Sequence, residues 1–278
     1  LIFPGHGHIT ATAVFLFLMA QVFCIANQKG GVGKTTTTVN LAAALALRDR
    51  RVLLVDLDPQ GNGTMGCGID KREIECSVYQ LLLGLKSFDD VVRRSETGGF
   101  DVLPANRELS GAEIELISIR ERDQRLKKTL GPVMDRYDYI LIDCPPSLSM
   151  LTLNALCFAN GVIVPMQCEY FALEGLTDLV ASIRRVHNEK NPGLRIISIL
   201  RVMFDPRITL QQQVSEQLKK HFGDKVFNTI IPRNVRLAEA PSYGKPGVVY
   251  DRSSRGAMAY KAFADEIISR MEAKKKNG

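Results

Sequence analysis

The chain has 278 residues, of which 45% are hydrophobic and 24% charged, so it is long enough to bury one sizeable core. It shows no internal repeat, no low-complexity stretch and no linker long enough to separate two domains, so we expect a single domain. Six scattered cysteines without a Cys-x-x-Cys pair are typical of reduced packing residues in a cytosolic protein. The net charge of +6 fits binding to a polyanion without proving it.

The first 18 residues differ from the rest of the chain. The chain begins with Leu1, and the apolar stretch from Ile9 to Ala20 lacks the basic start of a signal peptide. This stretch is also shorter than the ~20 residues that a membrane-spanning helix needs. Because Met19 is a natural start position, we expect residues 1–18 to be a non-native or mis-called extension. Residues 19–272 are expected to form the folded domain, and residues 273–278 a basic tail.

Apolar runs alternate with helical patterns along the chain. The runs that predict buried strands are Val22–Ala26, Val52–Asp56, Tyr139–Asp143, Val162–Met166 and Ile196–Val202. The stretches with helical periodicity are Val39–Leu47, Leu173–His187 and Thr209–Phe222. This alternation predicts an α/β fold with a doubly wound, mostly parallel sheet and helices on both faces.

A glycine-rich loop lies between the first predicted strand and the helix that follows it. Its glycines lack Cβ atoms, so backbone N–H groups can turn inward onto phosphate oxygens, and the helix start adds partial positive charge. We expect Lys34 to reach the β and γ phosphates and the Thr35 hydroxyl to complete a Mg²⁺ shell. A turn with two solvated lysines is the alternative. The expected nucleotide-binding residues are Lys29, Gly30, Gly31, Val32, Gly33, Lys34, Thr35 and Thr36.

This loop departs from the common Gly-x-x-x-x-Gly-Lys-[Ser/Thr] pattern. Gln28 stands where a glycine is usual, and a second lysine, Lys29, precedes the glycines. The sequence Lys-Gly-Gly-x-Gly-Lys-Thr resembles the deviant Walker A loop of the ParA and MinD group of P-loop ATPases. The resemblance implies an ATP-bound homodimer in which Lys29 crosses the interface and contacts the partner's nucleotide.

Two predicted strands end in carboxylates. One ends in Asp56 and is followed by Asp58, and the other ends in Asp143. Ligands of open α/β sheets lie at the carboxyl ends of the strands, so we expect all three beside the phosphates. Asp143 is the expected Walker B carboxylate, which holds Mg²⁺ through water. The resemblance implies that Asp58 orients or activates the attacking water and that Asp56 supports Mg²⁺; capping of the next turn is the alternative for both.

The identity of the base is inferred from a missing motif. Guanine-specific P-loop proteins usually read the base with Asn-Lys-x-Asp after a strand, whereas residues 201–205 read Arg-Val-Met-Phe-Asp. Adenine is therefore favoured, and the expected cofactors are ATP and Mg²⁺. The resemblance places Pro232, Arg233 and Asn234 against the adenine, and an ordinary turn at the end of a strand is the alternative for these residues.

Catalysis in such sites depends mainly on positioning and charge neutralisation. No arginine finger is evident in cis beside these motifs, so we expect a weak basal ATPase that a partner accelerates. The residues expected to take part in hydrolysis are Lys29, Lys34 and Asp58.

Two further stretches, residues 168–176 and 232–246, are similar to the chromosomal ParA (Soj) branch, and the similarity runs from Ala20 to Ile268. The resemblance implies that the ATP-bound dimer binds double-stranded DNA without sequence preference through Arg207 and Arg236. Guanidinium groups suit this role because they neutralise backbone phosphates without reading bases, although most surface arginines are simply solvated. It also implies a ParB-type centromere-binding partner and a role in segregating chromosome or plasmid DNA.

Two alternatives to this function remain. A MinD-like, membrane-cycling ATPase of division-site placement would end in an additional amphipathic helix. Here only residues 272–278 follow the apolar stripe from Tyr260 to Met271, so we expect no stable membrane association and a cytoplasmic, nucleoid-associated protein. The other alternative is a DNA-binding adaptor with a vestigial nucleotide site, against which the intact Thr35, Asp58 and Asp143 argue.

Overall fold

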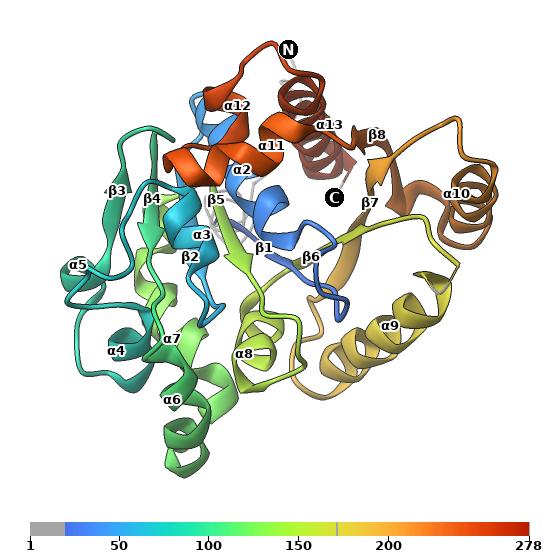
Figure 1. Ribbon diagram of the computed structural model, residues 1–278. Coiled ribbons are helices and arrows are strands. Elements are labelled where there is room, and N and C mark those ends of the chain that lie inside the picture. Colours follow the sequence, from blue (N-terminus) through green and yellow to red (C-terminus); the bar gives the residue numbers. More distant parts are fainter. Residues whose placement is uncertain (1–19, 171, 278) are drawn as a thin grey trace, which may run out of the picture.

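The structure, a computed structural model, describes residues 20–170 and 172–277, with the backbone alone for residues 275–277. These residues form an eight-stranded sheet in the order β3-β4-β2-β5-β1-β6-β7-β8, covered by helices on both faces (Figure 1). Neighbouring strands are parallel except for β3 and β4, which are antiparallel. The strands are β1 Gln21–Ile25, β2 Val52–Asp56, β3 Arg93–Ser95, β4 Phe100–Leu103, β5 Tyr139–Asp143, β6 Gly161–Met166, β7 Arg195–Phe204 and β8 Val226–Pro232.

Most of the helices connect one strand to the next. The α-helices of the described residues are α2 Lys34–Ala46, α3 Asn62–Gly66, α4 Val78–Leu83, α5 Phe88–Val91, α6 Leu109–Glu115, α7 Arg125–Leu130, α8 Met150–Phe158, α9 Ala172–Glu189, α10 Thr209–Phe222, α11 Val235–Glu239, α12 Gly247–Tyr250 and α13 Arg255–Asn277. The 3₁₀ helices are η1 Leu116–Ser118, η2 Arg122–Gln124, η3 Gly131–Arg136, η4 Gly223–Lys225 and η5 Ala240–Tyr243.

The sheet separates two hydrophobic cores. On one face α2 and α13 pack against the strands, with fully buried Leu41 and Phe263 among the core residues. On the other face α4 and α6 to α10 contribute a second core, which includes Leu82 and Leu218. The central strands are therefore covered on both sides, which is why β2 and β5 are buried along their whole length and read as continuous apolar runs.

Strand β1 lies between β5 and β6, at the point where the chain changes its direction across the sheet. Open α/β sheets bind their ligands at such a point, beyond the carboxyl ends of the strands. The register places Ile25 opposite Asp143, and Asp143 opposite Asp56. The glycine-rich loop and both carboxylates therefore lie at one edge of the sheet.

The fold class and the five predicted strands are confirmed: β2 and β5 have the predicted bounds, and the bounds of β1, β6 and β7 differ by one or two residues. Helix α2 begins at Lys34, directly after the glycines as the phosphate-loop motif predicts, and its first turns carry threonines ahead of the apolar periodicity of Val39–Leu47. Strands β3, β4 and β8 were not predicted: β3 is a polar edge strand, and Asn228 and Thr229 interrupt the apolar pattern of β8. Helix α13 continues through residues 273–277, whereas the proposed extension 1–18 lies outside the described residues.

Candidate active site

The glycine-rich loop connects β1 to α2. Gly31 and Gly33 have φ angles of +73° and +78°, a region that side chains with a Cβ rarely adopt, and Gly33 is the N-cap of α2. Gly30 and Gly31 are exposed, while Val32 is buried and anchors the loop. The loop therefore has the backbone geometry that presents N–H groups to an anion.

Lys34, the first residue of α2, lies inside this loop. Its side chain is 7% exposed, and its Nζ donates a hydrogen bond to the backbone oxygen of Lys29 at 3.1 Å. Burial lowers the pKa of the Lys34 ammonium, while the nearby carboxylates of Asp143 and Asp58 oppose this shift. A cation held at the centre of an anion-binding loop is the arrangement that phosphate binding requires.

Asp56 and Asp143 are fully buried on adjacent strands. Burial raises the pKa of Asp143, and the charge of Asp56 adds to this shift, while hydrogen bonds from the Thr35 and Thr38 hydroxyls oppose it. Burial also raises the pKa of Asp56, against the hydrogen bonds from Thr64. Two buried carboxyl groups side by side are stabilised in their charged form by a cation.

The environment of Asp143 fits Mg²⁺. Its Oδ1 accepts a hydrogen bond from Thr38 Oγ1 at 3.1 Å, whereas its Oδ2 is buried without a hydrogen-bond partner among the described residues. The Thr35 hydroxyl, in the first turn of α2, also acts to lower the pKa of this carboxylate. A carboxylate and a hydroxyl are hard oxygen donors of the kind that Mg²⁺ prefers. Within residues 20–170 and 172–277, no group of three or more His, Cys, Asp or Glu side chains could hold a metal by itself.

Asp56 lies next to this position, but protein donors occupy its oxygens. Asp56 Oδ2 accepts hydrogen bonds from Thr64 N at 2.7 Å and Thr64 Oγ1 at 2.8 Å, and Asp56 Oδ1 accepts one from Asp58 N at 3.1 Å. A Cβ on Gly63 would lie 2.9 Å from Asp56 Oδ2, so only glycine fits there. With its oxygens occupied in this way, Asp56 can act on a cation through its charge without binding it directly. Its contact with Asp58 N also orders the turn that carries Asp58.

Asp58 follows β2 and is half-buried at the edge of the site. Its Oδ1 accepts a hydrogen bond from Gln60 N at 2.9 Å, which is the turn-capping contact that the alternative interpretation expects. No hydrogen bond to its second carboxylate oxygen is formed within residues 20–170 and 172–277, so this oxygen can orient a water molecule. The structure therefore brings Asp58 near the buried pair and allows both roles.

A cavity of about 230 Å³ lies beside the loop and contains the three residues predicted to contact the base. Asn234 also caps α11, since its Oδ1 accepts a hydrogen bond from Leu237 N at 3.3 Å. The apolar part of the lining is suited to a planar base. The cavity is lined by Gly33, Thr36, Val202, Met203, Ile231, Pro232, Arg233, Asn234, Leu237, Ala238 and Tyr260.

Several residues of the site were not predicted from the sequence. Met203 has a φ of +51°, which is uncommon for a residue with a side chain, and its sulfur accepts a hydrogen bond from Gln167 Nε2 at 2.8 Å. Lys29 forms an ion pair with Glu169 from the loop after β6. Thr64 holds Asp56 as described above. Lys29 itself belongs to the predicted phosphate loop, whereas Met203, Glu169 and Thr64 had no predicted role, because their contacts arise only when different elements pack together.

The two arginines predicted to bind DNA lie outside this site. Arg207, in the loop after β7, is 87% exposed at its side chain and pairs with Asp205 at 2.7 Å. Arg236, in α11, is 54% exposed and pairs with Glu239 at 2.9 Å and with Asp251 at 3.5 Å. Pairs between exposed groups are weak, so both guanidinium groups can exchange a carboxylate for a phosphate.

Comparison with known proteins identifies the family. The family described as AAA domain matches residues 20–196. The sporulation initiation inhibitor protein Soj of Bacillus subtilis is 51% identical over 249 residues, which are 90% of this chain and 98% of that protein. The chromosome partitioning protein ParA of Caulobacter vibrioides is 49% identical over 252 residues, 90% of this chain and 94% of that protein. The chain belongs to the ParA/Soj family of P-loop ATPases.

The fold of this ParA/Soj chain is also similar to that of a solved structure. The cobyrinic acid a,c-diamide synthase of Mycobacterium smegmatis, with bound ADP and magnesium, aligns with a TM-score of 0.81 at 38% identity. The alignment covers 92% of this chain and 97% of that chain. In the described part of the ParA/Soj chain, no helix is both long and apolar enough to cross a membrane.

Proposed function

We propose that this protein is an ATP-dependent DNA-partitioning ATPase. Two chains each bind ATP and Mg²⁺ and form a sandwich dimer, which binds double-stranded DNA without sequence preference. Hydrolysis, stimulated by a ParB-type partner, releases the dimer from DNA. The relatives at about half identity that carry the names Soj and ParA support this role.

The position of Lys29 is the observation that carries the proposal. Lys34 is buried within its own loop, whereas the side chain of Lys29 is 55% exposed and turns to Glu169 at the rim. One loop lysine is therefore available for the chain's own nucleotide, and the other is available for a neighbouring molecule. A Lys29 that reaches the nucleotide of a second chain makes ATP binding and dimer formation interdependent.

The residues of the site have distinct tasks in this mechanism. The loop N–H groups and Lys34 would hold the phosphates, and Thr35 and Asp143 are the protein groups that would hold Mg²⁺. When bound, the metal neutralises charge that develops on the phosphates. Asp58 orients the attacking water at the carboxyl end of β2. Pro232, Arg233 and Asn234 line the space for the adenine.

DNA binding is assigned to Arg207 and Arg236 because both are exposed cations whose present partners are weak surface pairs. Dimer formation would bring two copies of each to one DNA duplex. Contacts to phosphates alone give strong salt dependence and no sequence preference. In the cell, such binding would associate the ATP-bound form with the nucleoid.

The partner is expected to be basic. The nucleotide motifs contain no arginine that could neutralise charge in the transition state, so basal turnover should be slow. A basic segment of a ParB-type centromere-binding protein can supply the missing charge.

The diamide synthase relative has a different activity by name, but it is 38% identical, whereas the partitioning relatives are 51% and 49% identical.

The experiment that tests this function measures binding of the purified chain to a non-specific DNA duplex with ADP, with ATP and with a slowly hydrolysed ATP analogue, at two salt concentrations. Binding that is salt-sensitive and occurs only with the triphosphates is expected, and Lys34→Ala serves as the control that cannot hold the phosphates. Binding without nucleotide would favour the adaptor function. No DNA binding, together with ATP-dependent binding to liposomes, would favour the MinD-like function.

A further inference from the structure

Thr38 lies one turn along α2 from Lys34 and is fully buried. It follows the phosphate loop, whose expected nucleotide contacts end at Thr36, and it belongs to none of the predicted sets of site residues. Its Oγ1 lies 3.0 Å from Lys34 O and 3.1 Å from Asp143 Oδ1. The Thr38 hydroxyl therefore joins the helix that begins at the loop to the strand that ends in the Walker B carboxylate.

The Thr38 hydroxyl carries a single proton, although two acceptors lie within hydrogen-bonding distance of it. A bond to the backbone oxygen four residues earlier is a common local contact of threonine in helices. A bond to an ionised carboxylate is shorter and stronger than a bond to a neutral carbonyl. The charged form of Asp143 is therefore the preferred acceptor, and the hydroxyl then holds its carboxylate.

This contact restrains the orientation of the Asp143 carboxylate. The torsion that rotates an aspartate carboxylate is broad, so covalent geometry alone does not fix its plane. The bond from Thr38 engages Oδ1, while Oδ2 is buried without a hydrogen-bond partner among the described residues. A buried polar atom without a partner is costly, so we expect this oxygen to face a ligand in the working protein.

The neighbouring Asp56 is held in the same way, but more completely. Thr64 Oγ1 donates to Asp56 Oδ2 at 2.8 Å, and Asp58 N donates to Asp56 Oδ1 at 3.1 Å. The described residues therefore engage both oxygens of Asp56 but leave Oδ2 of Asp143 without a partner. A Cβ at Gly63 would lie 3.4 Å from Asp143 Oδ2, so the glycine keeps space beside that atom.

We propose that Thr38 is a positioning residue for the Mg²⁺ site. It holds the Asp143 carboxylate by Oδ1, so that Oδ2 is the oxygen left for the metal or for a water molecule of its shell. Thr38 itself binds neither the metal nor the nucleotide, and it acts through Asp143 alone. This inference rests on the proposed ATPase function and adds a residue outside the loop to its metal site.

This role confines the effect of Thr38 to the metal. Lys34 and the loop N–H groups would hold the phosphates with or without Mg²⁺, and their contacts to phosphate do not involve the Thr38 hydroxyl. Loss of a group that orients a metal ligand typically lowers metal affinity by about 10–100-fold. We therefore expect Thr38→Val, which keeps the shape of the side chain but lacks the hydroxyl, to weaken metal binding and not nucleotide binding.

The test measures binding of Mn²⁺, a paramagnetic substitute for Mg²⁺, to the full chain with one equivalent of ADP. ADP is used because the proposed dimer needs the triphosphate, so dimer formation does not enter the result. Electron paramagnetic resonance of free Mn²⁺ gives the dissociation constant of the metal. A titration of fluorescent ADP in EDTA, followed by anisotropy, gives the affinity for the nucleotide alone.

Three substitutions of Thr38 separate the hydroxyl from the packing. Thr38→Val removes the hydroxyl at nearly constant volume, and Thr38→Ala removes it without adding a methyl group, in case the valine variant does not fold. Thr38→Ser keeps the hydroxyl on a smaller side chain. Thr37→Val is the matched control, because Thr37 is equally buried in the same turn but its hydroxyl pairs with Tyr260 OH at 3.0 Å.

Thr38→Val and Thr38→Ala are expected to weaken Mn²⁺ binding at least tenfold and to keep ADP affinity in EDTA within twofold of the unchanged protein. Thr38→Ser and Thr37→Val should bind Mn²⁺ within threefold of the unchanged protein. Unchanged Mn²⁺ affinity in the variants without the hydroxyl would overturn the role. An equal loss in Thr38→Ser or Thr37→Val would also overturn it, as would a loss of ADP affinity in EDTA as large as the loss for Mn²⁺.

The same experiment separates this role from the proposed function, because it needs neither DNA nor a partner. A selective loss of Mn²⁺ binding in Thr38→Val, together with no ATP-dependent DNA binding by the unchanged protein, would count against the partitioning function and support the role of Thr38. If the unchanged protein with ADP held Mn²⁺ no more tightly than free ADP does, the role of Thr38 would be overturned whatever the outcome with DNA.

Discussion

The ammonium group of Lys29 and the carboxylate of Glu169 form an ion pair between residues 140 positions apart in the chain. Lys29 precedes the glycines of the phosphate loop, and Glu169 lies in the loop between β6 and α9. Both side chains are about half exposed, so the pair is held at the rim of the nucleotide site. In the proposed dimer this contact competes with the contact of Lys29 to the partner's nucleotide.

Removal of Glu169 should therefore favour the dimer. An exposed ion pair contributes about 0.2–1 kcal/mol, so Glu169→Gln is expected to lower the dimer dissociation constant by up to about fivefold for each pair lost. Sedimentation velocity with a slowly hydrolysed ATP analogue measures this constant, and Glu174→Gln, at an exposed position of α9, is the control.

Lys29→Ala should bind nucleotide and fail to form a stable dimer. An intact ATP-dependent dimer in that variant would refute the role of Lys29 across the interface.

Asp58→Ala should stop hydrolysis without loss of the dimer. Asp58 lies at the edge of the site, and loss of a group that positions or activates the attacking water typically lowers turnover by about 10²-fold or more. We expect a dimer that remains on DNA after ATP is added, detected as a complex that persists during a chase with unlabelled duplex. Normal phosphate release by the variant would remove Asp58 from the mechanism.

Gly63→Ala tests the packing around the buried carboxylates. The added Cβ would lie 2.9 Å from Asp56 Oδ2 and 3.4 Å from Asp143 Oδ2. The crowding should cost about 1–3 kcal/mol of unfolding free energy and weaken Mg²⁺-dependent nucleotide binding. Chemical denaturation and nucleotide titration with and without Mg²⁺ measure the two effects.

Gly175→Ala is the control, because a Cβ at this position meets no described atom within 4 Å. This substitution should stabilise α9 by about 0.5–1 kcal/mol. Equal behaviour of the two variants would contradict the assigned geometry.

The arginine assignment predicts a change in salt dependence. Arg207→Ala and Arg236→Ala should each weaken ATP-dependent DNA binding for all duplex sequences alike. Each lost phosphate contact should reduce the slope of log affinity against log salt concentration by about 0.9. Filter binding or anisotropy over a salt series gives these slopes, and Arg184→Ala is the control. A slope unchanged by both variants would place the DNA-binding face elsewhere.

Glu266 links β8 to α13 and predicts a pH dependence of stability. Burial would raise the pKa of Glu266, but hydrogen bonds from Thr229, Asn228 N and Arg270 outweigh it and lower the pKa below the ordinary 4.5. The charged form of Glu266 therefore contributes its full stabilisation of the fold above the ordinary pKa of 4.5. This contribution is lost as the pH falls through the lower pKa of the folded state.

We accordingly expect Glu266→Gln to lose about 1–3 kcal/mol of unfolding free energy at pH 7 and little near pH 3. Urea denaturation at both pH values measures the difference from the unchanged protein. Glu216→Gln, at an exposed position of α10, should show no such pH-dependent loss. A loss for Glu266→Gln that is equal at both pH values would show that packing, rather than charge, stabilises this contact.

The sequence alone determined five strands of the sheet, the phosphate loop and the carboxylates at the strand ends. Buried parallel strands must be apolar along their whole length, so β1, β2 and β5 are visible as runs. Parallel strands end at the same edge of the sheet, so the sequence places Asp56 and Asp143 beside the loop.

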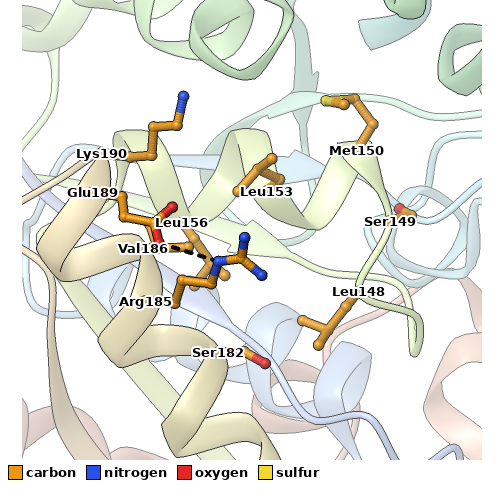
Figure 2. Close-up of a pocket in the computed structure, with 10 residues that line it drawn as sticks. All are labelled: Leu148, Ser149, Met150, Leu153, Leu156, Ser182, Arg185, Val186, Glu189 and Lys190. Carbon is orange, nitrogen blue, oxygen red and sulfur yellow. Dashed lines mark hydrogen bonds and ion pairs between the residues drawn. The ribbon is translucent and has the colours of Figure 1, made fainter.

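Only the tertiary structure decided which side chains complete that site. Thr64 holds Asp56 from helix α3, Met203 takes a positive φ in strand β7 at the base cavity, and Glu169 reaches Lys29 from the loop after β6. These contacts join different elements of the fold, and the local pattern of one element does not reveal which residue of another element it meets. The groove between α8 and α9, which is lined by Leu148, Leu153 and Val186 among others, has the same origin, since a loop and two helices line it (Figure 2). Local composition specifies each element, whereas the packing of distant elements specifies the contacts between them.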